Sequence, residues 1–463
     1  MTTHRSSSGR EGIVSLPPRV IPFDHPGLGD RSYLLLDEAA GVGAVIDPQR
    51  DVEPYQRAAT AHGCRIVLAL ETHLHNDFVS GARRLAQAGA TVVAGRAGEL
   101  AYPHRAVQGG DVIELGSLRI DVRATPGHTP EHVSYLVPGE PPLLFSGGAL
   151  SPGGAARIDL FGPDEARRLA ALAHATVDGL LGLEGRTQVL ATHVGGSFCS
   201  TGAHGPADTT IAIERDQNRF AALADAEAFL AAALRDIPPA PGYYPAVRAR
   251  NRSGDLSAPP RPHALTHERF AELVREGVTI VDTRPSVDYD RRHVRGSLAI
   301  GLVGVFGPWT AWLAPADRSL ALVVADPEAG ASATSALAAV GRDDVRGFAV
   351  GIAGSSVDLA ATERVQARSL LEPTRPGILD VRWTYEWREG HVPGATHLAV
   401  DDLARDPDVA RRFPGPVAVH CAADYRSTIA VSLLERAGKD AIIHIGDGFS
   451  GWVRAGGPVT TAE

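Results

Sequence analysis

The chain has 463 residues, of which 44% are hydrophobic, and carries a formal net charge of -9. This length is enough for roughly two to four domains, each with its own core. The charge is spread without long blocks, which argues against nucleic acid or a membrane as a partner and leaves small metabolites. Three scattered cysteines do not make a disulfide framework, and the N-terminus lacks an apolar stretch of signal-peptide length. We therefore expect a cytoplasmic protein.

The first part of the chain alternates short apolar stretches with helix-like segments and glycine-rich turns. This pattern is typical of a layered α/β domain. We expect strands at residues 32–36, 44–46, 66–70 and 91–94. A stretch rich in proline, glycine and serine between residues 237 and 262 indicates a linker. We therefore place the first domain at residues 1–250.

Histidines gather just after the third of these strands. His73, His75 and Asp77 stand two apart in one short run, and His128 and His193 follow later. Imidazoles two apart at the end of a strand can converge on one ion, and a histidine from another strand can complete the site. We expect His73, His75 and His128 to bind a metal, with Asp77 and His193 as their hydrogen-bond partners or as alternative ligands.

The last two hundred residues contain an internal repeat. A buried strand followed by Asp-x-Arg and then by His-x-x-Gly occurs twice, and the separation from Asp282 to Asp380 equals that from His293 to His391. Each copy predicts a strand, a short helix and a second strand. We therefore expect two tandem α/β domains, at residues 263–358 and 366–463.

The second repeat carries a cysteine in a reactive setting. Cys421 follows the apolar stretch 416–420 and precedes a predicted helix at 429–437, with Arg426 five positions further on. Backbone N–H groups at the start of a helix and a nearby guanidinium favour a thiolate. We interpret Cys421 as a nucleophile assisted by Arg426. The expected substrate contacts in the loop are Ala422, Ala423, Asp424, Tyr425 and Ser427.

Both repeats resemble rhodanese domains, and the loop from Cys421 to Arg426 resembles the six-residue active loop of that family. Related phosphatase domains have a loop one residue longer, so the resemblance implies transfer of sulfur through a Cys421 persulfide. The fourth loop position, often glycine in the family, is Asp424, whose carboxylate would repel thiosulfate and favour a neutral or protein-bound donor. Residues 322–325 of the first repeat offer no thiol, which implies an inactive domain with a packing role.

The first domain resembles the metallo-β-lactamase fold, an αββα sandwich, and within it the persulfide dioxygenase branch. Residues 46–48, 71–81, 125–130 and 191–193 carry this resemblance. In that branch a ferrous ion is held by two histidines and an aspartate. His73 and His128 match the histidines, but Gly148 stands at the place of the aspartate, and Arg157 falls where the family has a substrate-binding arginine. The domain order resembles that of bacterial persulfide dioxygenase/rhodanese fusions.

Three interpretations of the metal domain stay open. His73, His75 and His128 form a three-histidine site for Fe(II) or zinc, or Asp77 or Asp159 supplies a carboxylate. In the third, the domain has no cofactor and Arg157 still binds thiols. Phe78 stands where dinuclear zinc hydrolases of this fold have a histidine, which disfavours such a hydrolase. Cys199 lies close to His193 in the sequence, and a place in the metal pocket and a packing role are equally open.

These observations predict an enzyme of sulfur metabolism. Cys421 would act as a thiosulfate or persulfide sulfurtransferase, and the metal domain would oxidise or bind low-molecular-weight persulfides. The expected small-molecule partners are thiols, persulfides, thiosulfate and sulfite, with homo-oligomers implied by the resemblance. The alternatives are a non-catalytic protein that binds or senses persulfides, and a zinc thioester hydrolase.

Overall fold

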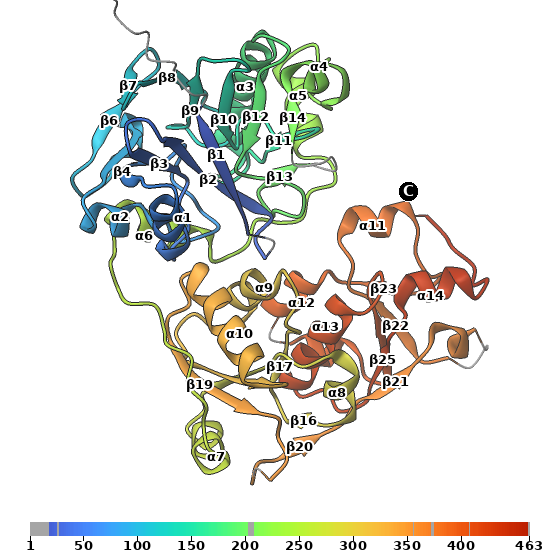
Figure 1. Ribbon diagram of the computed structural model, residues 1–463. Helices are drawn as coiled ribbons and strands as arrows, with labels where there is room; N and C mark the ends of the chain where they lie inside the picture. Colours follow the sequence, from blue (N-terminus) through green and yellow to red (C-terminus); the bar gives the residue numbers. More distant parts are fainter. Residues whose placement is uncertain are drawn as a thin grey trace, which may run out of the picture.

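The computed structural model describes residues 18–25, 27–201, 208–354, 356–371, 375–406 and 408–461. We call the part up to Gly254 the N-terminal domain, residues 264–360 the middle domain, and residues from Glu363 onward the C-terminal domain. Figure 1 shows the N-terminal domain, coloured blue to green, beside α9 (Phe306–Leu313) and α10 (Pro327–Ala339) of the middle domain. Within the described ranges, no helix has the length and apolar character needed to cross a membrane.

The N-terminal domain contains two six-stranded sheets. The first has the order β1 (Arg19–His25), β2 (Asp30–Asp37), β3 (Val42–Ile46), β4 (Arg65–Leu70), β5 (Thr91–Gly95) and β6 (Arg105–Val107). The second has the order β14 (Thr209–Thr210), β12 (Gln188–Ala191), β10 (Leu143–Gly147), β9 (Val133–Val137), β8 (Leu118–Ala124) and β7 (Val112–Leu115). Their inner faces share one apolar core, which includes Ile46, Leu70 and Tyr135.

Helices cover the outer faces of both sheets and make four layers. Beside the first sheet lie α1 (Glu53–Ala61), α2 (Ala82–Gln87) and α6 (Tyr244–Ser253), and beside the second lie α3 (Pro163–Leu181), α4 (Ile211–Gln217) and α5 (Ala226–Ala233). The remaining short elements are η1 (Arg96–Gly98), β11 (Ala155–Ala156) and β13 (Ser200–Thr201). The αββα architecture predicted from the sequence is therefore confirmed, because the apolar stretches are strands buried between the layers.

The middle and C-terminal domains contain parallel sheets with matching strand order. The middle sheet runs β17 (Leu298–Ala299), β15 (Thr279–Asp282), β18 (Leu320–Val324) and β19 (Val345–Val350). The C-terminal sheet runs β23 (Thr396–His397), β22 (Gly377–Asp380), β24 (Val417–His420), β25 (Ile442–Ile445) and β21 (Glu363–Val365). Since β21 pairs with β25, the C-terminal sheet begins before the predicted boundary at residue 366.

Short helices surround these two sheets. The middle domain also has α7 (His267–Arg275), α8 (Ser286–Arg291) and a ribbon of β16 (His293–Val294) with β20 (Leu359–Ala360). The C-terminal domain has η2 (Ala367–Leu370), α11 (Thr384–Glu389), α12 (Val400–Arg405), η3 (Val409–Arg412), α13 (Tyr425–Arg436) and α14 (Gly448–Arg454). One hydrophobic core runs through both domains, so that Leu322 and Phe348 belong to the same cluster as Leu379 and Ile429.

Contacts between side chains also tie the N-terminal domain to the rest of the chain. The Arg50 guanidinium, buried at this junction, binds the Asp343 carboxylate at 2.5 Å and donates to the carbonyls of Ala338 and Ser257 at 2.8 Å each. Aromatic rings form a second link, with Phe198 5.8 Å from Trp312 between centroids. Trp309 of the same helix stacks at 5.8 Å on Trp383 of the C-terminal domain.

Candidate functional site

The predicted metal-binding residues meet at one edge of the N-terminal domain, where strands of both sheets end. β4 ends at Leu70 and leads into the loop with His73, β10 ends just before Gly148, and β12 ends just before His193. His128 follows the end of β8. Because β3 and β4, and β10 and β12, run parallel, their carboxyl ends place these side chains together.

Three of the histidines form one set of nitrogen ligands. In each, Nδ1–H donates to an oxygen: His73 to Thr72 Oγ1 at 2.8 Å, His128 to the Arg157 carbonyl at 2.7 Å, and His193 to Asp30 Oδ1 at 2.8 Å. This leaves the three Nε2 lone pairs free, which is how protein histidines are oriented toward metals. The ligand atoms of the three residues lie within 4.8 Å of one another.

The chemistry of this set fits a metal ion. His73 Nε2 and His193 Nε2 face each other at 3.2 Å, and His128 Nε2 is buried with no hydrogen-bond partner. Burial holds the pKa of His73 and His128 well below the ordinary value of 6.5, so both rings are neutral. A cation satisfies such converging lone pairs, and neutral imidazole is the form that binds it. The domain therefore has a histidine cluster able to bind a metal.

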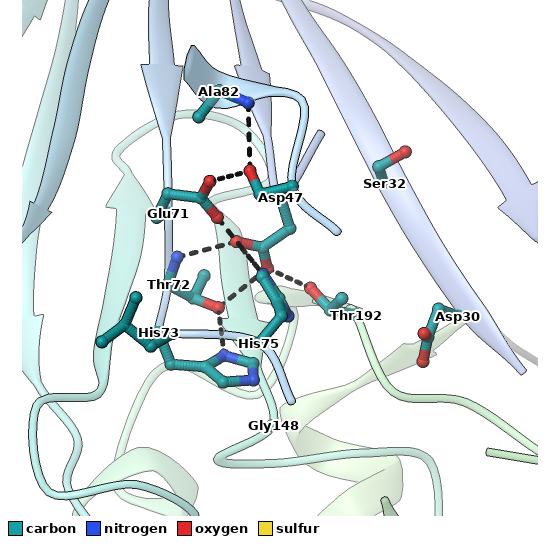
Figure 2. A network of polar contacts seen from close by, with 12 residues as sticks. Asp30, Ser32, Asp47, Glu71, Thr72, His73, His75, Ala82, Gly148 and Thr192 are labelled. Atoms are coloured by element: carbon teal, nitrogen blue, oxygen red, sulfur yellow. Dashed lines mark hydrogen bonds and ion pairs between the residues drawn. The ribbon is translucent and has the colours of Figure 1, made fainter. Parts of the chain in front are cut away.

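Asp47 organises the loops that carry these ligands. Its carboxylate accepts from the Thr72 backbone N–H at 2.7 Å and from the Thr72 hydroxyl at 2.8 Å. The Thr192 hydroxyl, next to His193, also donates to it. Figure 2 shows Asp47 between these two threonines, with the His73 ring below it. A single buried carboxylate thus fixes the loops after β4 and β12, through hydrogen bonds to charge that are stronger than neutral ones.

His75 lies between two buried carboxylates. Its Nε2 lies 3.2 Å from Asp47 Oδ1 and 3.3 Å from Glu71 Oε2, and its ring stacks on Phe78 at 4.1 Å. Burial alone would lower the pKa of His75, but the two carboxylates outweigh it and raise the pKa well above 6.5. The structure groups His73 and His128 with His193, and it groups the predicted ligand His75 with Asp47 and His73 and with Asp77 and His193. The role of His75 as a ligand stays a prediction.

The lack of a side chain at Gly148 leaves room for the rings of His128 and His193. A Cβ atom at this position would lie 2.8 Å from His128 Cδ2 and 3.0 Å from His193 Cδ2, closer than side chains normally approach. The Gly148 N–H donates to His132 Nε2 at 3.0 Å. The imidazole rings thus occupy the space that a side chain at position 148 would need, and the set closes around a glycine.

Two buried carboxyl groups lie behind His193. Asp30 binds its Nδ1, and Asp77 Oδ2 is 3.6 Å from the same atom. Burial raises the pKa of Asp30 and of Asp77 to about 7 each. Asp77 also forms a second possible ligand group with His75 and His193. The sequence places Asp77 at this site, whereas Asp30 gives no signal because its contact depends on the turn between β1 and β2.

Arg157, which the resemblance predicts to bind substrate, has a buried side chain with protein partners. Its side chain is 1% exposed, and its Nε and Nη2 each bind the Asp159 carboxylate at 2.7 Å. Nη1 donates to the Phe198 carbonyl at 3.1 Å. Every arm of the guanidinium thus has a protein partner, and the Arg157 carbonyl accepts from His128. The substrate contact of Arg157 and the metal-ligand role of Asp159 stay predictions.

Cys199 lies in an apolar cluster with Leu28, Phe78 and Tyr244. Its Sγ is 3.4 Å from the Tyr244 hydroxyl. Burial raises the pKa of the Cys199 thiol well above its ordinary value, so the thiol is neutral. Of the two interpretations left open, these contacts favour packing.

The thiol of the C-terminal domain lies where the sequence predicts it, between β24 and α13. Cys421 is 2% exposed, and its Sγ is 3.5 Å from Ser427 Oγ. Backbone N–H groups of Phe449 and Ser450 donate to the carbonyls of Cys421 and Ala422 at 2.8 and 3.0 Å and hold the loop against α14. In the middle domain the corresponding loop is formed by residues 324–326, whereas the thiol loop is formed by residues 421–424. The middle-domain loop is one residue shorter and has no thiol.

Arg426 lies at the beginning of α13 and is paired with a carboxylate. Its two Nη atoms bind Glu386 at 2.5 and 2.8 Å, and the guanidinium lies 5.5 Å from the Trp383 ring centre. Burial would lower the pKa of Arg426, but Glu386 and the nearby Cys421 raise it. The group therefore stays cationic beside the thiol, while Glu386 fixes its direction.

Asp424 does not present a free charge to the loop. Arg364 Nη2 binds its Oδ1 at 2.9 Å, and the Ser286 hydroxyl of the middle domain donates to its Oδ2. The predicted repulsion of thiosulfate is therefore offset by a guanidinium. Tyr425, predicted as a substrate contact, donates its hydroxyl to the Gly301 carbonyl at 3.4 Å. Both side chains thus join the loop to the middle domain.

Comparisons with known proteins agree with this architecture. Residues 31–193 match the metallo-beta-lactamase superfamily, and residues 363–455 match the rhodanese-like domain. Hydroxyacylglutathione hydrolase from Pseudomonas putida (strain GB-1) is 37% identical over 152 residues, which cover 31% of this chain and 58% of that protein. The chain thus spans a little over half of the curated relatives it matches.

Solved structures extend the comparison. A metallo-beta-lactamase structure from Staphylococcus aureus subsp. aureus COL is 26% identical and covers 72% of this chain and 98% of that one, with a TM-score of 0.64. ETHE1 from Myxococcus xanthus is 27% identical and covers 51% of this chain and 99% of that one, with a TM-score of 0.44. The chain therefore has an N-terminal domain of the metallo-beta-lactamase fold and, at its C-terminal end, a rhodanese-like domain.

Proposed function

We propose that the chain is a sulfur-handling enzyme in which Cys421 carries sulfane sulfur from a donor to an acceptor. The observation that carries this proposal is the position of Cys421 at a strand end, with the cationic Arg426 held beside it by Glu386. A thiol in a loop that enters a helix, next to a fixed positive charge, is the setting of a nucleophilic cysteine. Thiosulfate and low-molecular-weight persulfides are the proposed donors.

The transfer would proceed in two displacements. The Cys421 thiolate attacks the outer sulfur of the donor, so that a new S–S bond forms while the donor's S–S bond breaks. The electron pair leaves with sulfite or with the donor thiolate. An acceptor nucleophile then attacks the terminal sulfur of the persulfide, and the electron pair of that bond returns to Cys421. Arg426 and the N–H groups of the loop would stabilise the anionic sulfur at each stage.

For the N-terminal domain we propose one metal ion held by His73, His128 and His193, with Fe(II) as the metal and zinc as the alternative. A ferrous ion with three protein ligands has room for oxygen and a substrate, and supplies redox chemistry. Overall, persulfide, oxygen and water would give thiol, sulfite and two protons. In this proposal Asp30 and the Arg157 carbonyl orient the imidazoles, and the buried ring of Phe78 excludes water.

A second candidate is a metal-dependent thioester hydrolase. It is favoured by the likeness to hydroxyacylglutathione hydrolases, which extends over 152 residues. Against it stand the missing carboxylate at Gly148 and the Phe78 ring packed on His75, because a dinuclear centre would need ligands at both places. A third candidate is a protein that binds persulfides without turnover.

The sulfur transfer can be tested with thiosulfate as donor and cyanide as acceptor, by measuring thiocyanate. We expect Cys421→Ser to abolish its formation and Cys64→Ser, a buried cysteine far from the loop, to retain it. Mass spectrometry of protein incubated with thiosulfate should find one added sulfur atom on Cys421. If the unmodified protein forms neither thiocyanate nor this adduct, Cys421 is not a sulfurtransferase nucleophile.

The metal domain can be tested by loading the protein anaerobically with ferrous iron and adding glutathione persulfide. We expect oxygen uptake and sulfite formation, both lost in His128→Ala and kept in His174→Ala, whose histidine lies on α3. Release of thiol from an acylated glutathione by zinc-loaded protein would instead support the hydrolase. Binding of persulfide with neither reaction would support the non-catalytic alternative.

A further inference from the structure

A chain of buried polar groups leads from Cys421 across the domain boundary. Ser427 Oγ lies 3.5 Å from Cys421 Sγ and 2.9 Å from His444 Nε2. On the other side of the ring, His444 Nδ1 lies 2.7 Å from Asp290 Oδ2, and Asp290 belongs to α8 of the middle domain. We propose that Ser427, His444 and Asp290 form a proton relay that activates Cys421, so that the middle domain completes the thiol site.

The relay requires one arrangement of protons. In it, Asp290 accepts Nδ1–H of His444, and the Nε2 lone pair faces the Ser427 hydroxyl. This hydroxyl donates to the Asp424 carbonyl at 2.8 Å in the structure and turns toward Nε2 for the transfer. The side chains of His444 and Ser427 are fully buried, and that of Asp290 nearly so, so water does not compete for these contacts. The group thus resembles a catalytic triad, with Cys421 as nucleophile, His444 as base and Asp290 as the carboxylate that orients the base. The Ser427 hydroxyl lies between the nucleophile and the base.

The proton balance is simple. The Cys421 thiol gives its proton to Ser427 Oγ while the Ser427 hydroxyl gives its own to His444 Nε2. The result is a thiolate, an unchanged serine and an imidazolium, and no electrons are exchanged with a cofactor. The Asp290 carboxylate stabilises the imidazolium that forms. The thiolate is the form that attacks the donor sulfur, so the relay rests on the sulfurtransferase function proposed above.

Three charged side chains surround the His444 ring. Besides Asp290, the ring faces Asp424 Oδ1 at 3.4 Å from Nε2 and Arg364 Nη1 at 3.2 Å from Nδ1. Arg364 also binds Asp290 at 2.7 Å and Asp424 at 2.9 Å. Two carboxylates and one guanidinium thus lie against the imidazole, and they join the middle domain to the thiol loop.

A separate buried pair crosses the same boundary and offers a matched control. His293 Nε2 of the middle domain lies 2.8 Å from Glu435 Oε2 of α13, and Glu435 also accepts from the Gly296 N–H at 2.6 Å. Glu435 is at the end of α13 away from Cys421 and takes no part in the relay. Replacing it loosens the boundary without touching the proton path, so it separates a structural effect from a chemical one.

The experiment measures the rate at which iodoacetamide alkylates Cys421 as a function of pH, in the full chain with Cys64→Ser and Cys199→Ser. We expect Asp290→Asn and His444→Gln to move the alkylation midpoint upward by about one pH unit or more. We expect thiocyanate formation at neutral pH to fall by about 10²-fold, as for loss of a general base. Glu435→Gln should leave the alkylation profile unchanged.

Two results would overturn the relay. One is an unchanged alkylation profile in Asp290→Asn and His444→Gln with their near-UV circular dichroism intact, and the other is an equal shift in Glu435→Gln. If those variants fail to fold, Ser427→Ala, which removes only a hydroxyl, must give the upward shift alone. Alkylation needs no sulfur donor, so its result stands even if the unmodified protein forms no thiocyanate.

Discussion

His73 Nε2 and His193 Nε2 lie 3.2 Å apart at the edge where the two sheets of the N-terminal domain meet. Both rings donate their Nδ1–H elsewhere, so two lone pairs point at each other. Such an arrangement is unfavourable without a cation or a proton between the nitrogens. This relationship is why we propose His193 as a metal ligand beside His73 and His128.

Replacing His193 should therefore remove the metal. We expect His193→Ala to weaken binding of Co(II) or zinc by more than about 10 to 100-fold, the range for loss of a residue that only supports a ligand. His75→Gln should keep the metal, because its ring binds Asp47 and Glu71. Metal content after dialysis and the visible spectrum of the Co(II) protein measure both. Loss of metal in His75→Gln but not in His193→Ala would contradict the three-histidine set.

A side chain at Gly148 should destabilise the site. Its Cβ would lie 2.8 Å from His128 Cδ2, so Gly148→Ala should lower the free energy of unfolding by about 1–3 kcal/mol and weaken metal binding. Gly148→Asp should not restore a tighter site, for the same steric reason. Gly179→Ala is the control, because nothing lies within 4 Å of the Cβ added there. Tighter metal binding in Gly148→Asp would show that the rings move aside.

Breaking the Arg50 contact should uncouple the N-terminal domain. Arg50→Ala removes the buried guanidinium that binds Asp343 and donates to the Ala338 and Ser257 carbonyls, and we expect a loss of about 2–4 kcal/mol in unfolding free energy. All five tryptophans lie beyond residue 300, so fluorescence reports the later domains and far-ultraviolet circular dichroism the whole chain.

In urea, the two signals of Arg50→Ala should separate. Arg252→Ala, which removes an exposed ion pair with Glu99, should change unfolding by less than about 1 kcal/mol. Coincident transitions in Arg50→Ala, at the midpoint of the unmodified protein, would show that this contact does not hold the domains together.

His25 should make the fold sensitive to acid. Burial lowers the pKa of His25 to about 4 from 6.5, although Asp24 opposes this. The unfolded chain therefore binds this proton first as the pH falls, so the stabilisation is complete above about pH 6.5 and is lost progressively toward about pH 4. We expect His25→Gln to lose less unfolding free energy than the unmodified protein between about pH 7 and pH 5, by roughly 1–2 kcal/mol. His263→Gln, at an exposed position, is the control, and parallel pH profiles for all three proteins would contradict the prediction.

The sequence predicts those features that depend on residues close together along the chain. Strands β2 to β5 follow from apolar stretches, and the thiol loop follows from the spacing of Cys421 and Arg426. It does not predict contacts that depend on side-chain direction or on distant charges. His75 lies beside Asp47 and Glu71, Arg157 binds Asp159, and Asp424 binds Arg364.

The hydrophobic core that runs through the middle and C-terminal domains sets how this chain can be divided. A fragment beginning at residue 366 would lack β21, and α13 would have lost its contact with β17. Such a fragment would expose apolar surface and aggregate more readily than the parent. The middle and C-terminal domains must therefore be expressed and engineered as one piece.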